Sequence, residues 1–332
     1  MVIKTMIKKL LILILVLSAL AGAYFLLKPL VIEIYSVLPS QSPQAKKPIK
    51  LIFTGDIMLD RGVEYQVQKQ GNNDFRFPFL KIAPALENAD LIFGNLESQI
   101  SDKGQNQGSL YSFRADPKAM DGLEFAGFDI VSLANNHAFD YGRQALQDSI
   151  NRLIEADISP VGAGNESQAF SPTIKTIGQT SIAVFAYSQG PDTWQATGNS
   201  LGIAIISEKN LERIKSDITL AKELADIVIV SLHAGSEYEE SPTSEQILFA
   251  RAFIDAGADL VIGHHGHVIQ NSEIYKEKQI FYGLGNFVFD QGFSEETMEN
   301  EIIEVLIENN KIEKITPKTV KMNAFFQPEL AQ

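Results

Sequence analysis

The feature of this sequence that most constrains its fold is a pattern that recurs five times: a run of apolar residues that ends in a cluster of polar ones. The five segments are KLIFTGD from Lys50, ADLIFGNLE from Ala89, FDIVSLANNH from Phe128, ADIVIVSLH from Ala225 and ADLVIGHHGH from Ala258. Continuous β-branched runs of this length are typical of strands buried on both faces of a sheet. Since ligands bind outside the carboxyl ends of strands in open α/β sheets, we expect the five polar clusters to meet at one edge.

Helices and hairpins are expected between and after these runs. Asp116-Pro117 has the form of a helix N-cap and first turn, and Gly127 is placed to end that helix. Gly178-Gln179 and Asn309-Asn310 separate pairs of alternating segments and predict two β-hairpins. Amphipathic helices are expected over residues 143–156, 211–224 and 244–256. The sequence thus predicts a mixed α/β domain over residues 50–320, followed by a C-terminal tail over 321–332.

The first fifty residues differ from the rest of the chain. Residues 10–27 carry no charge and follow three lysines, so residues 1–30 are expected to form a single-pass membrane anchor with a cytoplasmic N-terminus. Ala21-Gly22-Ala23 also fits a signal-peptidase site, and its cleavage would release the domain as a secreted protein. Residues 31–49 are expected to be a linker, rich in proline and polar residues toward its end. Both alternatives place the domain outside the cytoplasm.

Charge and composition exclude several classes of function. The net charge is −13; residues 1–50 hold seven lysines and one glutamate, a net of +6, so the remaining 282 residues carry −19. Such a domain repels nucleic acid, which we exclude as a partner. The chain has no cysteine, which excludes disulfides, zinc–thiolate sites and a thiol nucleophile. No serine precedes an expected helix in the context that the nucleophile elbow of many serine hydrolases requires.

All five histidines of the chain lie in the polar clusters, in the company of acidic and amide residues. Imidazole combined with carboxylate and amide oxygen suits Zn, Mn or Fe, so we expect one or two divalent metal ions at the shared edge. His265 and His267 are two residues apart and would face the same side of an extended segment, which makes His264 a bystander facing away. Asp56 follows Gly55 in an expected turn, where it is suited to bridging metals.

Two residues after the third run have complementary chemistry. Asn136 can supply a neutral carbonyl oxygen to a metal, and His137 is a candidate general acid or a stabiliser of charge on a phosphate oxygen. Three arginines near the polar clusters are expected to hold an anionic substrate, although each could equally form an ordinary surface ion pair. They are Arg61, Arg114 and Arg143.

Taken together, these segments resemble the bacterial capsule synthesis family of CapA-type poly-γ-glutamate proteins, which is similar to the calcineurin-like metallophosphatases. The resemblance covers residues ~50–290. The matching segments are TGDIMLDRG at Thr54, GNLES at Gly94, GFDIVSLANNHAFDYG at Gly127, VSLHAGSEY at Val230, GADLVIGHHGHVIQ at Gly257 and IFYGLGNFVFD at Ile280. It implies a four-layer α-β-β-α sandwich with metal ligands on loops at one edge.

The resemblance also implies roles for single residues. Asp56 looks like the first metal carboxylate, and Asn136 and His137 look like the Asn-His pair of the phosphatases. Met58 stands where their first motif has histidine, and Gly94-Asn95 stands where their second has Gly-Asp, with the carboxylate of Glu97 two residues on. We place Glu97 among the metal ligands and Asn95 beside His137 as a catalytic candidate. The remaining implied ligands are His233, His265 and His267.

Three functions are compatible with this sequence. The resemblance implies an anchored accessory protein of capsule or poly-γ-glutamate synthesis or export, with a polyanionic polymer and other capsule synthase subunits as partners. The second is an exported phosphoesterase that hydrolyses small phosphate esters or diesters. The third is a binding module that holds metal without catalysis. Met58 is expected to serve packing, since a thioether is a poor ligand for hard divalent metals.

Overall fold

The computed structural model describes residues 22–23, 28 and 47–331. Most of the expected membrane anchor, Ala21 of the alternative cleavage site and most of the expected linker fall outside these residues. Within the part that is described, no helix has both the length and the apolar character needed to cross a membrane. Residues Pro48–Gln332 form one compact unit, which contains all five apolar runs.

The first of two large sheets has eight strands. Its order is β18-β17-β16-β1-β2-β5-β6, and β15 pairs with the end of β1. The strands β1, β2, β5, β6 and β15 run parallel, while β16, β17 and β18 are antiparallel to their neighbours. The bounds are β1 Ile49–Ile57, β2 Leu91–Leu96, β5 Ile130–Ser132, β6 Ser159–Val161, β15 Asn286–Val288, β16 Glu299–Glu308, β17 Lys311–Met322 and β18 Pro328–Leu330.

The second large sheet has six strands in the order β13-β14-β12-β11-β9-β8. Its central strands β9, β11, β12 and β14 are parallel, and the edge strands β8 and β13 are antiparallel. The bounds are β8 Thr173–Ile177, β9 Thr180–Ser188, β11 Ile227–His233, β12 Leu260–His264, β13 Ser272–Tyr275 and β14 Lys278–Phe281. Two small pairs complete the strands: β3 Gln99–Ile100 with β4 Arg114–Ala115, and β7 Ala163–Gly164 with β10 Gly202–Ile203.

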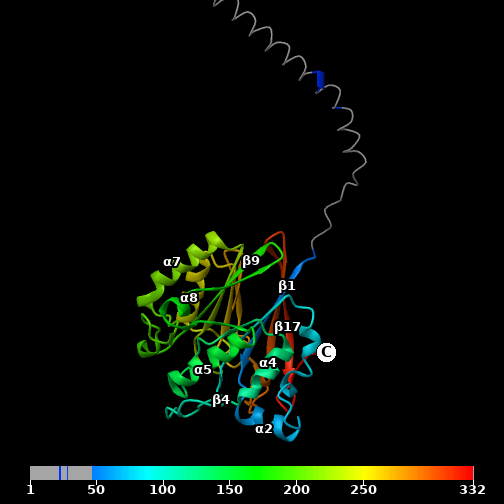
Figure 1. The fold of residues 1–332 in the computed structure, drawn as a ribbon, viewed down its shortest axis with the longest axis vertical. Helices are drawn as coiled ribbons and strands as arrows, with labels where there is room; N and C mark the ends of the chain where they lie inside the picture. The colour runs from blue at the N-terminus through cyan, green and yellow to red at the C-terminus, as the bar shows by residue number, and fades with distance from the viewer. Residues whose placement is uncertain (1–21, 24–27, 29–46, 332) are drawn as a thin grey trace, which may run out of the picture. The chain divides into compact units, whose positions relative to one another are not determined.

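Helices cover the outer face of each sheet (Figure 1). The α-helices are α2 Arg61–Lys69, α3 Ala83–Leu86, α4 Met120–Ala126, α5 Gly142–Glu155, α6 Glu166–Phe170, α7 Glu208–Leu224 and α8 Ser244–Asp255. Single 3-10 turns are formed by Phe77–Phe79, Pro117–Ala119, Asp192–Trp194 and Glu296–Met298. α2, α4 and α5 pack on the eight-stranded sheet, and α7 and α8 pack on the six-stranded sheet.

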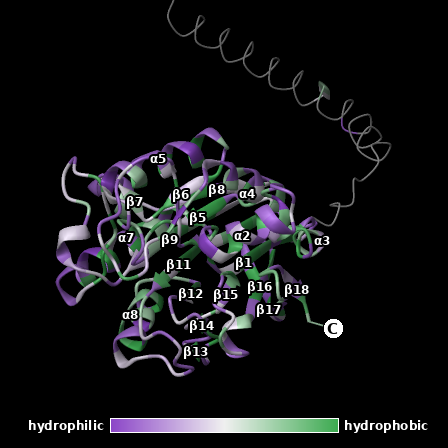
Figure 2. Cartoon of the chain, turned by 90° about the horizontal axis from the view of Figure 1, so that it is seen from below, coloured by the Kyte–Doolittle hydropathy of each residue, from purple (hydrophilic) through white to green (hydrophobic). Residues whose placement is uncertain are grey.

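Alternate residues of each strand enter different cores, which explains why the apolar runs are continuous. Leu51 and Phe53 of β1 lie in a core shared with Ile229 of β11, between the two sheets. Ile52, which points the other way, packs under the helices of the eight-stranded sheet together with Val63. Figure 2 shows strands such as β5, β9 and β11 in green, as hydrophobic segments inside the more polar helices. Two sheets with a core between them and helices outside make four layers.

Most of the expected elements are present. The four expected helices are confirmed, with Asp116 accepting a hydrogen bond from the Lys118 amide and Gly127 ending α4 at a φ of 78°. Both hairpins form, and Asn309 and Asn310 have φ values of 51° and 62°, as a type I′ turn requires.

The five apolar runs form strands as expected, three in one sheet and two in the other, in agreement with the two sheets of a four-layer sandwich. One expectation differs from the structure. The eight-stranded sheet extends beyond residue 320, where we expected a tail. β17 continues to Met322, and β18 pairs with it antiparallel, with the buried residues Met322 and Pro328 opposite each other.

Candidate metal centre

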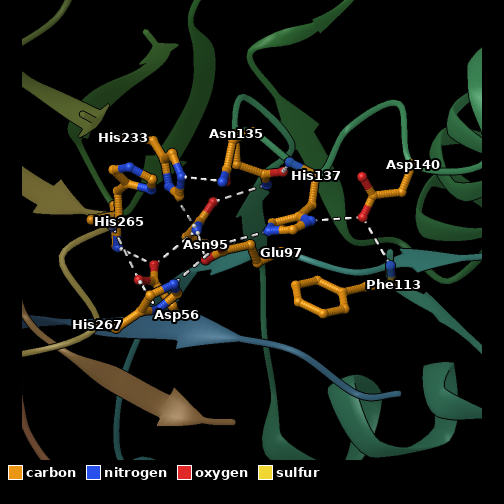
Figure 3. Close-up of polar contacts among 12 residues, drawn as sticks. Asp56, Asn95, Glu97, Phe113, Asn135, His137, Asp140, His233, His265 and His267 are labelled. Carbon is orange, nitrogen blue, oxygen red and sulfur yellow. Dashed lines mark hydrogen bonds and ion pairs between the residues drawn. The ribbon is translucent and has the colours of Figure 1, made fainter. Parts of the chain in front are cut away.

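The polar residues that follow the five runs come together where the carboxyl ends of the two sheets meet (Figure 3). The eight-stranded sheet contributes residues from β1, β2 and the segment after β5. The six-stranded sheet contributes the end of β11, the end of β12 and the turn after it. The expectation of one shared edge is therefore met by two sheets.

Asp56 lies within β1, and not in a turn as we expected. The pairing of β1 with β2 shifts register between Phe53 and Asp56, so the strand bulges at this point. Gly55 permits the bulge, since a Cβ added to it would lie 1.9 Å from the carbonyl oxygen of Gly285. The Asp56 amide donates to that same carbonyl over 3.0 Å. The bulge aims a nearly fully buried carboxylate at the cluster.

The carboxylate of Asp56 is held by groups from both sheets. Oδ1 accepts a hydrogen bond from Asn95 Nδ2 over 2.8 Å, and Oδ2 accepts the backbone N–H of His265 over 3.1 Å. His264 Nδ1 lies 3.1 Å from Oδ1. Burial alone would raise the pKa of Asp56, but the contact with His264 and the nearby imidazoles hold it well below its ordinary value. Asp56 is therefore an anion in this site.

Asn95 lies at the centre of the site (Figure 3). Its Nδ2 is 2.8 Å from Asp56 Oδ1, 3.2 Å from Glu97 Oε2 and 3.2 Å from His233 Nδ1. An amide nitrogen has two hydrogens, so three acceptors compete for them. Asn135 donates to Asn95 Oδ1 over 3.2 Å and fixes the orientation of the amide. Asn95 thus orients the groups around it.

Glu97 is the most unusual residue of the cluster. Its side chain is fully buried, and its Oε1 has no hydrogen-bond partner among the described residues. That oxygen lies 3.8 Å from His137 Nε2 and 3.8 Å from His267 Nε2. Burial, followed by repulsion from Asp56 and Glu237, raises the pKa of Glu97 well above its ordinary value. A buried carboxylate with an unpartnered oxygen calls for a cation.

His233 ends β11 and is nearly fully buried. Burial, with help from nearby His265, lowers its pKa well below 6.5, so the ring is neutral. Its Nε2 lies 2.9 Å from Asn136 Oδ1 and its Nδ1 lies 3.2 Å from Asn95 Nδ2, so a side-chain amide faces each ring nitrogen. Asn136 thus orients the ring of His233.

His265 and His267 lie in a turn after β12. Their φ values are 90° and 56°, in the left-handed region, so the extended segment that we expected is wrong. Both rings still face the cluster, with centroids 6.3 Å apart. His267 Nδ1 donates to Asn286 Oδ1 over 2.9 Å, which leaves its Nε2 lone pair toward Glu97. Nδ1 of His265 is buried and has no described partner. Burial lowers the pKa of both rings.

His264 is not the bystander that we expected. It is the last residue of β12, its side chain has no exposed surface, and its Nδ1 faces Asp56. The expectation failed because alternation along an extended segment was applied to a turn. His264 contacts the site from behind Asp56, where it orients the carboxylate.

His137 is held by a carboxylate that sequence analysis missed. Its Nδ1 donates to Asp140 Oδ2 over 2.6 Å, and the backbone N–H of Phe113 donates to the same oxygen over 2.8 Å. The ring of Phe113 packs against His137 with centroids 4.0 Å apart. The Nε2 atom of His137 is thereby turned toward Glu97. Asp140 follows His137 by three residues, a spacing that a search for acid–base pairs would have found.

Two sets of three residues place one ligand atom each within 4.8 Å of one another. The first consists of Glu97, His233 and His265, and the second of Asp56, Glu97 and His267. Oxygen and imidazole donors in this proportion fit Mn, Fe or Zn. A bound metal ion would also give a partner to Glu97 Oε1 and His265 Nδ1, which have none among the described residues. Glu97 is shared by both sets, so it is better placed than Asp56 to bridge two ions.

The three candidate arginines are placed differently. Arg61 pairs with Asp290 through two nitrogens and stacks over Phe113, so its charge is already neutralised. Arg114 and Arg143 donate to backbone carbonyl oxygens, and no contact joins either of them to a candidate metal ligand among the described residues. Met58 is fully buried in the core under the helices, in agreement with a packing role.

Sequence reasoning missed three supporting residues: Asp140, His264 and Asn286. Each contacts a candidate site residue through a hydrogen bond or ion pair. Asp140 and His264 lie beside recognised site residues in the sequence, whereas Asn286 reaches the site from a strand far along the chain, and local residue spacing does not reveal the pairing of that strand with β1.

Comparison with known proteins agrees with these observations. Residues 50–291 match the family described as bacterial capsule synthesis protein PGA_cap. The chain is 32% identical to the capsule biosynthesis protein CapA of Bacillus anthracis, over 81% of this chain and 68% of that protein. It is 31% identical to the PGA biosynthesis protein CapA of Bacillus subtilis (strain 168), over 83% of this chain and 74% of that protein.

Solved structures share the fold at low sequence identity. A hypothetical protein from Thermus thermophilus superposes with a TM-score of 0.51 at 18% identity, over 82% of this chain and 99% of that one. A protein described as a novel phosphatase from Mycoplasma pneumoniae superposes with a TM-score of 0.50 at 19% identity, over 83% of this chain and 94% of that one. The mixed α/β architecture is therefore one that a phosphatase also uses.

Proposed function

The chain belongs to the bacterial capsule synthesis protein family PGA_cap, and on this premise we propose that it is an accessory protein in the synthesis or export of an anionic capsule polymer such as poly-γ-glutamate. The names of its relatives in two Bacillus species support the polymer class. The observation that carries a chemical role is Glu97, a buried carboxylate shared by two sets of metal-ligand atoms.

The proposed setting is the outer face of the cell membrane. The uncharged segment over residues 10–27 would anchor the chain with its N-terminus in the cytoplasm, and cleavage after Ala23 would instead release it. The net charge of −19 on residues 51–332 argues against nucleic acid as a partner. Other capsule synthase subunits are proposed partners, since an accessory protein acts beside the enzyme that makes the polymer.

One or two divalent ions would be held by Asp56, Glu97, His233, His265 and His267, with Asn136 within reach through its amide oxygen. Such an ion, when bound, polarises a phosphoryl or carbonyl oxygen and lowers the pKa of a water molecule. Asn95 orients Asp56 and Glu97 by hydrogen bonds. Asp140 accepts a hydrogen bond from Nδ1 of His137. Nε2 then faces the cluster and would be the atom that exchanges a proton with a substrate.

A second candidate function is hydrolysis of phosphate esters or diesters. The observation that favours it is the pairing of His137 with Asp140, because a carboxylate at Nδ1 orients the ring and leaves Nε2 to exchange a proton, as general acid catalysis needs. A binding module without catalysis would need neither the buried Asp140 nor the ring of Phe113 behind the imidazole.

Metal content and hydrolysis of the full chain separate these functions. We expect elemental analysis to find Mn, Fe or Zn at one or two ions per chain. Asp140→Asn should leave that content unchanged and lower phosphoesterase turnover about 100-fold, the lower end of the effect of general acid catalysis. If the protein binds metal but hydrolyses no phosphate ester in a screen, the non-catalytic binding module is the function that remains. A chain that binds no divalent metal under any loading condition would overturn the proposed metal centre.

A further inference from the structure

The segment VSLHAGSEY, which carries His233, ends in a residue to which the proposed function gives no role. Tyr238 lies on the loop after β11, five residues beyond His233, and it is 45% exposed. Its ring stacks on the ring of the candidate metal ligand His267, with centroids 5.9 Å apart and an angle of 30° between the planes. A half-exposed side chain thus packs against a buried ligand of the metal centre.

The backbone of Tyr238 is held in a conformation that costs free energy. Its φ is 63°, in the left-handed region that a residue with a bulky side chain rarely adopts. Its N–H donates to the carbonyl oxygen of Gly266 over 2.8 Å, inside the turn that carries His265 and His267. Backbone strain persists where surrounding contacts hold it, and it is common at functional sites. The strained residue is therefore joined directly to the turn that supplies two ligands.

A chain of side-chain hydrogen bonds gives a second link between Tyr238 and His267. Gln291 Nε2 donates to the hydroxyl oxygen of Tyr238 over 3.1 Å, and Gln291 Oε1 accepts from Asn286 Nδ2 over 3.0 Å. Asn286 Oδ1 accepts in turn from His267 Nδ1 over 2.9 Å. The chain ends on the ring nitrogen opposite Nε2, the atom that faces Glu97.

The direction of these hydrogen bonds is fixed by a backbone group. The carbonyl oxygen of Thr297 can only accept, and Asn286 Nδ2 donates to it over 3.1 Å. Asn286 Oδ1 therefore faces His267, whose Nδ1 carries the proton and whose Nε2 keeps its lone pair for a metal ion. The second hydrogen of Asn286 Nδ2 goes to Gln291 Oε1, so the amide nitrogen of Gln291 faces the phenol.

A metal ligand needs a fixed ring direction as well as a fixed tautomer. Groups that hydrogen-bond the other nitrogen of a ligating histidine change metal affinity about 10- to 100-fold. Tyr238 restrains the direction of the His267 ring in two ways, since it packs on the ring and holds the side chain of Gln291. Phe293 packs edge-on against Tyr238, with centroids 5.2 Å apart, so the phenol is itself restrained.

We propose that Tyr238 is a positioning residue of the metal centre, which holds the ring of His267 directly by stacking and indirectly through Gln291 and Asn286. The loop after β11 thereby supports a ligand that comes from the turn after β12. His233 ends β11, so one segment supplies a ligand and also orients another. The inference rests on the proposed metal centre and names a residue that orients one of its ligands.

Metal binding by the full chain carrying Tyr238→Phe tests the hydrogen-bonded link, because phenylalanine keeps the ring and loses only the hydroxyl. We expect affinity for Mn²⁺ to fall about threefold, within the range for one hydrogen bond. Tyr238→Ala also loses the stacked ring and should lower affinity about tenfold. Tyr275→Phe is the matched control, since it removes a hydroxyl that donates to Asp255, on the edge strand β13.

A double variant tests whether Tyr238 acts through Gln291. Gln291→Leu breaks the chain in its middle, so adding Tyr238→Phe to it should cause no further loss of affinity. The visible spectrum of bound Co²⁺ reports the arrangement of its ligands, and we expect it to shift in Tyr238→Phe and in Gln291→Leu but not in Tyr275→Phe. A residue that only stabilised the fold would lower the Tm and leave this spectrum unchanged.

Exchange of the His267 Nδ1 proton with water, measured by nuclear magnetic resonance on metal-free protein, gives a readout that does not depend on metal. We expect faster exchange in Tyr238→Phe than in Tyr275→Phe. Equal affinities, spectra and exchange rates for these two variants would overturn the proposal, and so would additive losses in the double variant. If the unmodified chain bound no metal, the proposed metal centre would fail, and the proton exchange would still decide whether Tyr238 holds His267.

Discussion

The two sheets contribute different chemistry to one site. The eight-stranded sheet supplies oxygen and amide groups, from Asp56, Asn95 and Glu97, and the imidazole of His137 after β5, while the six-stranded sheet and its following turn supply the other imidazoles. The oxygen side is largely satisfied by its own hydrogen bonds, which run through Asn95. The imidazole side keeps a buried nitrogen of His265 without a described partner.

This difference shows where the missing component must lie. The one oxygen on the carboxylate side that lacks a partner among the described residues is Glu97 Oε1, and it faces the imidazole side at 3.8 Å from His267 Nε2. That separation is too long for a hydrogen bond but leaves room for an ion between the two atoms. The two sides are therefore incomplete separately and complementary together.

The largest expected effect comes from removing the charge that both sides share. Glu97→Gln should lower affinity for divalent metal by at least about 100-fold, since a ligand counts for more than its supporting groups. His233→Ala should remove the ion of its own set and leave the set of Asp56, Glu97 and His267 able to bind. Isothermal titration with Mn²⁺ measures both affinity and stoichiometry.

Glu301→Gln is the control for that experiment. Glu301 is half-buried in the same sheet, and burial raises its pKa as it does for Glu97, but it lies outside both ligand sets. If Glu97→Gln binds metal as tightly as Glu301→Gln does, Glu97 is not shared between the two sides.

A smaller effect is expected at the contact between His264 and Asp56. His264→Phe removes the group at Nδ1 and should weaken metal binding about tenfold, the lower end for a supporting residue. His264→Asn places an amide donor near the same point and should restore affinity to within about threefold. A merely structural role for this buried side chain predicts equal losses in both variants. Metal titration, with thermal unfolding of the metal-free protein alongside, separates the two roles.

The smallest effect is on the pH dependence of the metal-free protein, because the two sides oppose each other. Burial lowers the pKa of His233, His265 and His267, so the unfolded chain binds more protons than the native one below about pH 6.5. These three histidines therefore lower the free energy of unfolding as pH falls below 6.5, by up to about 1.4 kcal/mol per pH unit for each ring. The raised pKa of Glu97 acts with the opposite sign on the free energy of unfolding. The stability that it contributes at low pH is lost as pH rises above 4.5.

Denaturant unfolding of the protein, freed of metal by a chelator, between pH 4.5 and 6.5 measures the sum of these opposing contributions. Glu97→Gln should steepen the loss of stability on acidification, and His233→Gln should flatten it. Identical slopes for the two variants would mean that the carboxylate and the imidazole do not titrate as the structure implies.

The fold follows from sequence patterns wherever those patterns are local. The runs at Lys50 and Ala258 predict buried strands, and Asn309-Asn310 predicts its hairpin, because strand and turn chemistry depend on neighbouring residues. The assignment of runs to two sheets is decided by packing between distant segments. Short pairs such as β3 with β4 carry too few residues for a periodic signal.

The sequence predicts which residues form the site, but it does not predict how they are arranged. The polar clusters name Asp56, Glu97 and the histidines, and the structure brings these together. The bulge at Asp56 depends on the carbonyl of Gly285, which lies far along the chain. The left-handed backbone at His265 and His267 lets His264 face Asp56 while the two following rings also face the cluster, and residue spacing alone does not reveal such a turn.

The position of bound metal tests the central claim most directly. Crystals of the protein grown with Mn²⁺ and measured at the manganese absorption edge would show each ion as an anomalous peak. The structure predicts a peak bonded to Glu97 and to imidazoles of the six-stranded sheet, with a second ion, if bound, sharing Glu97 with Asp56 and His267. Peaks only outside this cluster, or none at saturating Mn²⁺, would contradict a metal centre built from both sheets.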